Sequence, residues 1–358
     1  MKRNHTRIMI RPLTLLTVLA VLFSGCGKQN VPADEEVDEG QYISFSCSAA
    51  QTRSGAGNVL TNTDERLRNS SFGIYGFKTS LADASINSNM ANVFATSGAQ
   101  EVGWDSGANV WTYSPKRKWE QSLYYRFRAF WPYEANVNPA SNATRIGVEY
   151  RSTSEQYDLL VAYSTRHPLV EGIEKVPMKF HHALSGLRFQ IKFVEDKTPK
   201  GTVDYVTRFY LQGLYSVGYM IYGQLSDGDD VDKIEWIFDR GGNTFDSSSR
   251  MFEWTGHEEF SISATATGEN KVATVFDNDH VVLIPPQTLS APNNATPTTA
   301  NFYTEEGGDA LHQVELPETA LQPGKIYTFT LLIHSTYVVV NIDIKEWDEL
   351  QSNVDINL

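Results

Sequence analysis

Short runs of alternating apolar and polar residues recur along this chain of 358 residues and constrain its fold more than any other feature. Successive side chains of a β-strand point to opposite faces, so each run predicts a strand with one buried face. The runs are Tyr42–Cys47; Tyr125, Phe127, Ala129 and Trp131; Leu187, Phe189, Ile191 and Phe193; Val203, Tyr205, Phe209 and Leu211; Phe260, Ile262, Ala264 and Ala266; Tyr327, Phe329, Leu331 and Ile333; and Val340, Ile342 and Ile344. No segment keeps the helical period of about 3.6 residues over several turns, so we expect an all-β fold.

Turn-forming residues separate these runs, as at Ser106–Asn109 and Asp227–Asp230. Many short strands joined in this way are typical of antiparallel β-sandwiches. The length of chain beyond residue 41 suits two such units. We therefore predict two tandem antiparallel β-sandwiches, over residues 42–180 and 181–358.

Residues 1–25 have the pattern of a secretory signal peptide. Four cations and no acid come first, and they are Lys2, Arg3, Arg7 and Arg11. The apolar stretch Leu13–Phe23 follows, and it is too short to cross a bilayer stably. Leu22–Cys26 then resembles a bacterial lipobox, with Phe23 at the position where Leu is usual. The resemblance implies cleavage before Cys26 and acyl chains on that cysteine, which would anchor the protein to a membrane.

Residues 26–41 are expected to form a lipidated, self-repelling tether. Asp34–Glu39 holds five acids, and few apolar residues lie near it. A helix cap at the start of the fold is the alternative interpretation. The chain has two cysteines, Cys26 and Cys47. Lipidation of Cys26 would leave no internal disulfide, so stability would have to come from the apolar core.

The charge of the chain excludes one class of partner. Without the four cations of the signal peptide, 26 Lys and Arg face 43 Asp and Glu, a net charge of −17. Nucleic-acid binding requires basic patches, so we expect no nucleic-acid partner. The same charge opposes a molecule that lies flat on an anionic membrane. It suits an ectodomain held off the outer membrane by its tether.

No segment completes a catalytic or metal-binding motif. Gly213–Gly218 has one residue too many for a serine-hydrolase turn, His257 lacks the second histidine of zinc proteases, and Asp227–Asp232 lacks the glycine of a calcium loop. His181 and His182 would point to opposite faces of a strand, so we expect a buried histidine satisfied by the backbone and no metal. We predict no enzyme activity, no cofactor and no metal; a hydrolase with an unrecognised site is the last alternative.

Seven tryptophans leave a second function open, with Trp104, Trp111 and Trp119 the candidates. Aromatic residues at strand spacing usually pack in a core, but exposed ones also stack on sugar rings. The alternative function is a surface lipoprotein that does not polymerise and that binds glycan through Trp104 and Trp111.

Seven stretches in order resemble motifs of the fimbrillin family of Bacteroidales, whose lipoproteins build, cap or anchor surface fimbriae. The stretches are Trp111–Tyr113 with Trp119, Tyr125–Tyr133, Asp158–Ala162, Val176–Ser185 continuing to Ile191, Leu283–Gln287, Gly324–Phe329 and Ile344–Trp347. Each motif is weak by itself, but seven in the right order indicate the family.

The resemblance implies transthyretin-like sandwiches and export of the lipoprotein to the cell surface for fimbrial assembly or adhesion. In polymerising members an arginine-specific protease removes the first strand, and the emptied groove accepts a strand from a neighbouring subunit. The candidate cleavage site here is Arg53, just after the predicted strand Tyr42–Cys47, with Arg66 and Arg68 as alternatives. Members that keep the first strand serve as anchors or tips. The roles of stalk, tip and anchor therefore stay open, as does a ligand on a host or bacterial surface.

Overall fold

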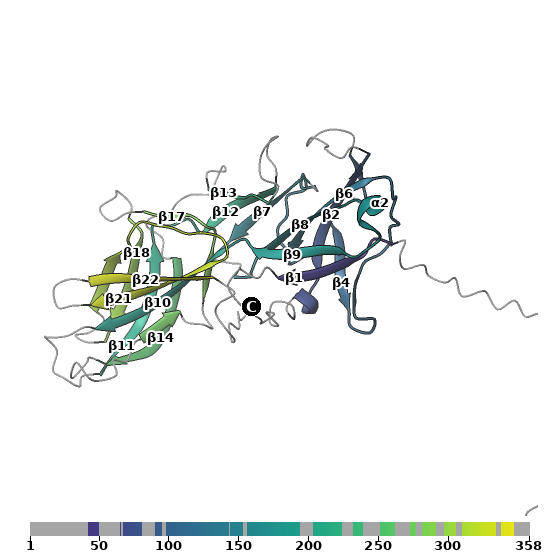
Figure 1. The fold of residues 1–358 in the computed structure, drawn as a ribbon. Coiled ribbons are helices and arrows are strands. Elements are labelled where there is room, and N and C mark those ends of the chain that lie inside the picture. The colour runs from purple at the N-terminus through teal and green to yellow at the C-terminus, as the bar shows by residue number, and fades with distance from the viewer. Residues whose placement is uncertain are drawn as a thin grey trace, which may run out of the picture. The chain divides into compact units, whose positions relative to one another are not determined.

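Figure 1 shows the fold of the chain in a computed structural model. It describes residues 42–49, 65, 67–80, 90–94, 98–142, 144–152, 156–193, 203–223, 232–238, 251–261, 273–276, 281–290, 297–305, 310–333 and 338–346. The predicted turn at Asp227–Asp230 and the predicted strand residues Ile262–Ala266 lie outside this part of the chain.

All strands of the N-terminal half except β7 build one large sheet among the described residues. Its strands are β1 (Phe45–Ala49), β2 (Phe72–Thr79), β3 (Ala91–Asn92), β4 (Gln100–Asp105), β5 (Val110–Thr112), β6 (Tyr124–Trp131), β8 (Leu160–Arg166) and β9 (Val176–His182). Their order across the sheet is β1-β9-β8-β6-β2-β4-β5, and β3 pairs with β2. The sheet is nearly barrel-shaped, since its two edge strands β1 and β5 also contact each other.

Four smaller sheets follow. The first contains β10 (Ser185–Phe193), β15 (Ala273–Phe276), β16 (Val282–Ile284), β21 (Lys325–Ile333) and β22 (Val338–Glu346). The second contains β11 (Val203–Gln212), β14 (Met251–Ser261), β18 (Thr299–Thr304) and β19 (Ala310–Glu315). The third joins β7 (Arg145–Arg151) to β12 (Val217–Gly223) and β13 (Ile234–Ile237), and the fourth pairs β17 (Thr288–Leu289) with β20 (Thr319–Ala320). The all-β prediction is confirmed.

Two strand pairs run in a direction that the sequence did not predict. The expectation of purely antiparallel sheets is wrong, because β1 pairs parallel with β9, and β10 pairs parallel with β21. Alternation of apolar residues reports which face of a strand is buried and carries no information on strand direction. A parallel pair needs a long connection, and both pairs join segments that lie far apart in the sequence.

Three apolar clusters form the core. One draws only on residues of the N-terminal half and includes Phe45 and Phe127. Another draws only on residues from Leu187 onward and includes Phe189 and Phe329. The third contains residues of both halves, from Phe130 to Ile326. The predicted inward residues Leu187, Phe189 and Ile191 of β10 are buried, and so are those of β21, from Tyr327 to Ile333. The alternation is confirmed for β21, whereas in β10 the predicted outward residue Arg188 is buried as well.

Three more strands depart from simple alternation, and in one of them, β22, the predicted inward residue Ile344 is 54% exposed. In β6, Arg128 and Phe130 are buried as well as the predicted inward residues, because this strand is covered on both faces. In β11, Val206 is buried where Tyr205 was expected to be. The pairing register shifts between Val206 and Arg208, and such a bulge moves the following side chains to the other face.

The helix α2 (Pro168–Glu171) connects β8 to β9. Among the described residues, no helix is long and apolar enough to span a membrane.

Candidate functional site: the seat of the first strand

The first strand supplies side chains to a core that later strands build. Ile43 and Phe45 point inward and are 1% and 2% exposed, whereas Ser46 between Phe45 and Cys47 is exposed. Cys47 lies at the margin of the same cluster. Burial of a large apolar side chain contributes about 1.5–3 kcal/mol, so Ile43 and Phe45 hold β1 in place. We call the surroundings of these two residues the β1 seat.

One wall of the β1 seat is β9. The ladder runs parallel from Phe45 opposite Val176 to Ala49 opposite Phe180. Just before it, the Val176 N–H donates to the Ser44 carbonyl at 2.8 Å. A strand in this seat is therefore fixed in direction and register by backbone hydrogen bonds.

The floor of the seat is aromatic. The Phe45 ring meets Phe127, Tyr113 and Phe72 at centroid distances of 5.6, 5.8 and 6.3 Å. The contacts with Phe127 and Phe72 are edge-to-face, a favoured geometry of aromatic pairs. The seat thus contains a pocket for one large apolar side chain at the position of Phe45.

The opposite wall is the loop of residues 113–121. The Ile43 N–H donates to the Arg117 carbonyl at 2.8 Å, and the Tyr113 hydroxyl donates to the Ile43 carbonyl at 3.0 Å. Tyr42 forms an isolated antiparallel bridge with Lys118. The start of β1 is therefore held from both sides, while Phe45–Ala49 forms its backbone ladder with β9.

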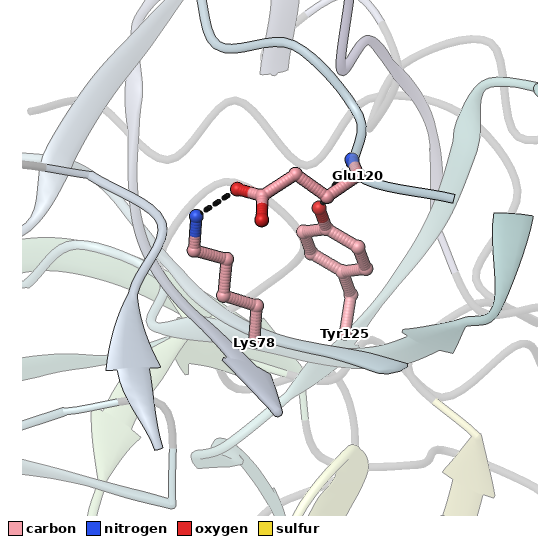
Figure 2. Close-up of polar contacts among 3 residues, drawn as sticks. All are labelled: Lys78, Glu120 and Tyr125. Atoms are coloured by element: carbon pink, nitrogen blue, oxygen red, sulfur yellow. Dashed lines mark hydrogen bonds and ion pairs between the residues drawn. The ribbon is translucent and has the colours of Figure 1, made fainter. Parts of the chain in front are cut away.

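Figure 2 shows how the end of this loop is fixed to the sheet. The Glu120 carboxylate forms an ion pair with Lys78 of β2. The Glu120 N–H donates to the Tyr125 hydroxyl of β6 at 2.8 Å. Two strands of the sheet, β2 and β6, thus hold the loop through contacts that do not involve β1.

Burial sets the protonation of the two tyrosines in this region. Burial raises the pKa of Tyr113 from 10.0 to about 12, and the backbone hydrogen bond from Arg117 opposes it in part. Burial also raises the pKa of Tyr125, again against a backbone hydrogen bond, from Glu120. The Tyr113 hydroxyl consequently keeps its proton at neutral pH and donates a hydrogen bond to the Ile43 carbonyl.

The candidate glycan residues lie in the wall of the same sheet. Trp104 and Trp111 face each other across β4 and β5, with their rings 5.3 Å apart. Trp111 is 6% exposed and also contacts Phe72 at 5.2 Å. Arg68 lies over the Trp104 ring at 4.9 Å. Both rings are engaged by protein side chains, and glycan binding by them stays a prediction.

The two adjacent histidines have different surroundings. His182 is buried, and its Nδ1 lies 2.8 Å from Oδ2 of Asp158, whereas His181 is exposed. The structure shows the Asp158 carboxylate at Nδ1, and the expected backbone partner stays a prediction. The pair joins two of the quoted motifs, Asp158–Ala162 and Val176–Ser185, at the β8–β9 ladder. Within the described ranges, no three metal-ligating side chains come together.

Three candidate residues lie outside the part of the chain that the structure describes: Cys26, Arg53 and Arg66. Arg68 is described and is exposed beside Trp104.

The contact between the 113–121 loop and Ile43 was not predicted from the sequence. Trp111–Tyr113 and Trp119 were noted as motif residues, yet nothing local indicates that Tyr113 bonds to Ile43, 70 positions away. The available signal was a polar hydroxyl within an aromatic-rich motif, since a buried tyrosine needs a hydrogen-bond partner.

The comparisons with known proteins agree with the motifs. A model of fimbrillin-like proteins matches residues 61–347. A fimbrial protein from Bacteroides vulgatus ATCC 8482 has a similar fold, with a TM-score of 0.54, 16% identity, and coverage of 86% of this chain and 99% of that chain. No curated protein matches the chain.

Two further solved structures are assigned to cell adhesion. The one from Bacteroides ovatus ATCC 8483 has a TM-score of 0.46 and 13% identity, over 86% of this chain and 96% of that chain. The one from Bacteroides uniformis ATCC 8492 has a TM-score of 0.42 and 14% identity, over 86% and 98%. On the family match, the chain belongs to the fimbrillin-like family, a family of fimbrial proteins of the cell surface that are not enzymes.

Proposed function

We propose that this protein is a lipid-anchored fimbrial subunit that assembles by strand exchange at the β1 seat. Proteolysis after Arg53 would release β1, and a strand from a neighbouring subunit would take its place beside β9. The incoming strand would need large apolar side chains at alternate positions, where Ile43 and Phe45 now lie.

One observation carries this proposal: a strand of five residues completes a core built by strands that follow Arg53. Its Phe45 side chain enters an aromatic pocket, and its backbone pairs with β9, the next strand of the sheet. Removing β1 would expose this pocket and one edge of β9, and an open edge with an apolar groove favours addition of a strand.

We also propose that residues 42–180 and 181–358 form two transthyretin-like sandwiches. One apolar cluster confined to each half supports this division. The third cluster, with residues of both halves, would then join the two domains.

The remaining parts of the proposal concern the N-terminus. Residues 1–25 would be the signal peptide, Cys26 would carry the lipid and residues 26–41 would be the tether to the outer membrane. The basic start, the short apolar stretch and the lipobox-like Leu22–Cys26 support this assignment.

The test is to determine the N-terminus of the protein produced in a lipoprotein-processing host, before and after an arginine-specific protease. A polymerising subunit gives a new N-terminus at Ser54 and oligomers that resist mild detergent. A lipid-modified Cys26 that persists would identify an anchor or tip.

Substitution of single arginines by lysine gives a matched set of controls. Arg53→Lys keeps the charge and should abolish both the cleavage and the oligomers, whereas Arg68→Lys should change neither. Cleavage at Ser54 that leaves only monomers would contradict strand exchange.

The glycan alternative would be favoured instead by glycan-array binding that is lost in Trp104→Ala or Trp111→Ala, without formation of fibres. The burial of Trp111 makes this the second candidate.

A further inference from the structure

We propose that the end of the fold where the chain enters β1 rests on an anionic lipid surface. The inference builds on the proposed lipid at Cys26 and names a contact that the anchor would bring about.

The first feature of this end is a pair of exposed apolar side chains on α2. Leu169 and Val170 are 66% and 76% exposed, the highest values among the large apolar side chains that the structure describes. We call them the apolar tip. Exposure of adjacent large apolar residues is typical of a contact site when the segment is held in place.

The apolar tip is held in place by its neighbours. The Leu169 N–H donates to the Gln121 carbonyl at 3.1 Å, and the Val170 N–H donates to the His167 carbonyl at 2.9 Å. The His167 ring stacks on Tyr124 at 3.9 Å. The side chains therefore project from a fixed turn of the chain.

The second feature is the basic run Lys116–Lys118. Lys116 and Lys118 are exposed and lie over the rings of Tyr113 and Tyr42, at 4.9 and 5.3 Å. The nearby acids are engaged by other cations. Their ion pairs are Glu120 with Lys78, and Glu171 and Glu174 with Arg166. The local charge of this surface is therefore positive, against the acidic remainder of the chain.

Backbone hydrogen bonds bring both features to one end of the molecule. Lys118 is bridged to Tyr42, and Gln121, three residues further on, is bonded to Leu169. Three residues span at most about 11 Å. In Figure 1, α2 lies at the end of the sheet where β1 and β9 begin. The apolar tip and the basic run thus share the end at which the described chain starts.

The length of the preceding chain selects a membrane as the occupant. The segment 27–41 connects Cys26 to Tyr42, and these 16 steps of the chain can span at most about 58 Å. A lipid on Cys26 would keep this end, rather than the opposite one, nearest the bilayer. Lysines around exposed apolar side chains are the combination that binds anionic headgroups and reaches the acyl boundary. The acidic remainder would be repelled, so the molecule would stand on this end and not lie flat.

The test uses the mature chain, residues 26–358, with Cys47→Ala, coupled through Cys26 to a maleimide lipid in vesicles. One set of vesicles contains phosphatidylglycerol in phosphatidylcholine, and the other contains phosphatidylcholine alone. Carbene footprinting with mass spectrometry then measures solvent access to Leu169 and Val170. Because chemical coupling replaces processing by the cell, failure of this test is distinct from failure of the lipid anchor or of strand exchange.

We expect labelling of the apolar tip to fall about threefold or more on the vesicles that contain phosphatidylglycerol, and to stay unchanged on those of phosphatidylcholine only. Labelling of Leu311, an exposed residue of β19, should stay unchanged. Lys116→Glu with Lys118→Glu should abolish the protection, since each lysine contributes about fivefold to the contact equilibrium. Lys233→Glu with Lys345→Glu makes the same charge change at exposed lysines elsewhere and should leave the protection intact.

Three results would overturn the proposal. The first is unchanged labelling of the apolar tip on anionic vesicles. The second is equal protection on phosphatidylcholine alone. The third is protection that rises with protein density on the vesicle, which would assign the tip to contact with a second copy of the chain.

Discussion

The two parallel strand pairs of the molecule differ in how firmly they hold their distant partner. In the N-terminal sheet, β1 has five residues and a ladder to β9 on one side, with isolated hydrogen bonds to the 113–121 loop on the other. In the C-terminal half, β21 has nine residues and ladders to both β10 and β22. One strand lies at an edge and the other in the interior of its sheet.

The difference supports β1, and not β21, as the strand exchanged under the proposed function. Strand β21 buries side chains at alternate positions along its whole length, from Tyr327 to Ile333, and its loss would open the C-terminal cluster on two sides. Strand β1 contributes mainly Ile43 and Phe45. The proposed exchange requires a strand that completes the core but is not needed to build it, and the short edge strand β1 suits that role better than β21.

The largest expected effect is the loss of the C-terminal cluster in Phe189→Asp. Phe189 is fully buried between Phe329 and Phe209, with ring centroids at 5.2 and 4.8 Å. Removal of the ring alone costs about 3–5 kcal/mol, and burial of an unpaired carboxylate adds to it. Thermal melting should show no cooperative transition for this region. Leu311→Asp, at an exposed position, should melt like the wild type, and an unchanged melt of Phe189→Asp would contradict the strand assignment.

A smaller effect is expected for Phe45→Ala in the β1 seat. It empties the aromatic pocket and should lower the free energy of unfolding by about 3 kcal/mol, measured by urea denaturation. The neighbouring Ser46→Ala alters an outward position and should change it by less than about 0.5 kcal/mol. Equal effects of the two substitutions would show that the Phe45 side chain does not hold β1 in place.

The smallest effect concerns the hydroxyl that closes the seat. Tyr113→Phe removes the hydrogen bond to the Ile43 carbonyl and should cost about 1 kcal/mol at neutral pH. The wild type should also lose stability in alkali. Because burial raises the pKa of Tyr113 to about 12, its contribution is complete below pH 10.0, the ordinary value, and is lost as the pH rises through about 12.

The variant isolates this contribution from those of other tyrosines. Burial also raises the pKa of Tyr125 and Tyr163, so the wild type will depend on pH at several sites. The difference in unfolding free energy between wild type and Tyr113→Phe should shrink between pH 10 and 12. A constant difference over this range would mean that the Tyr113 proton does not stabilise β1.

Much of the fold was predictable from residues such as Leu187, Phe189 and Ile191, whose alternation places them in the core as expected. The prediction failed at Tyr205, where a bulge in β11 moved Val206 inward instead. Nothing in the sequence indicated that His182 would pair with the Asp158 carboxylate, 24 positions away. A bulge and a distant ion pair both depend on the neighbouring strand, which alternation within one strand does not encode.

The all-β class and the inward faces of most strands therefore follow from the sequence alone, because side-chain alternation is a local property of the backbone. The motif order likewise indicated the family that the later match established. The tertiary structure decided which strands become neighbours, the parallel direction of β1 against β9, and the enclosure of Phe45 between β6 and the 113–121 loop. Strand pairing depends on contacts between segments far apart in the chain. These contacts stabilise the fold only when the sheet brings the segments together, so no local pattern of residues specifies them.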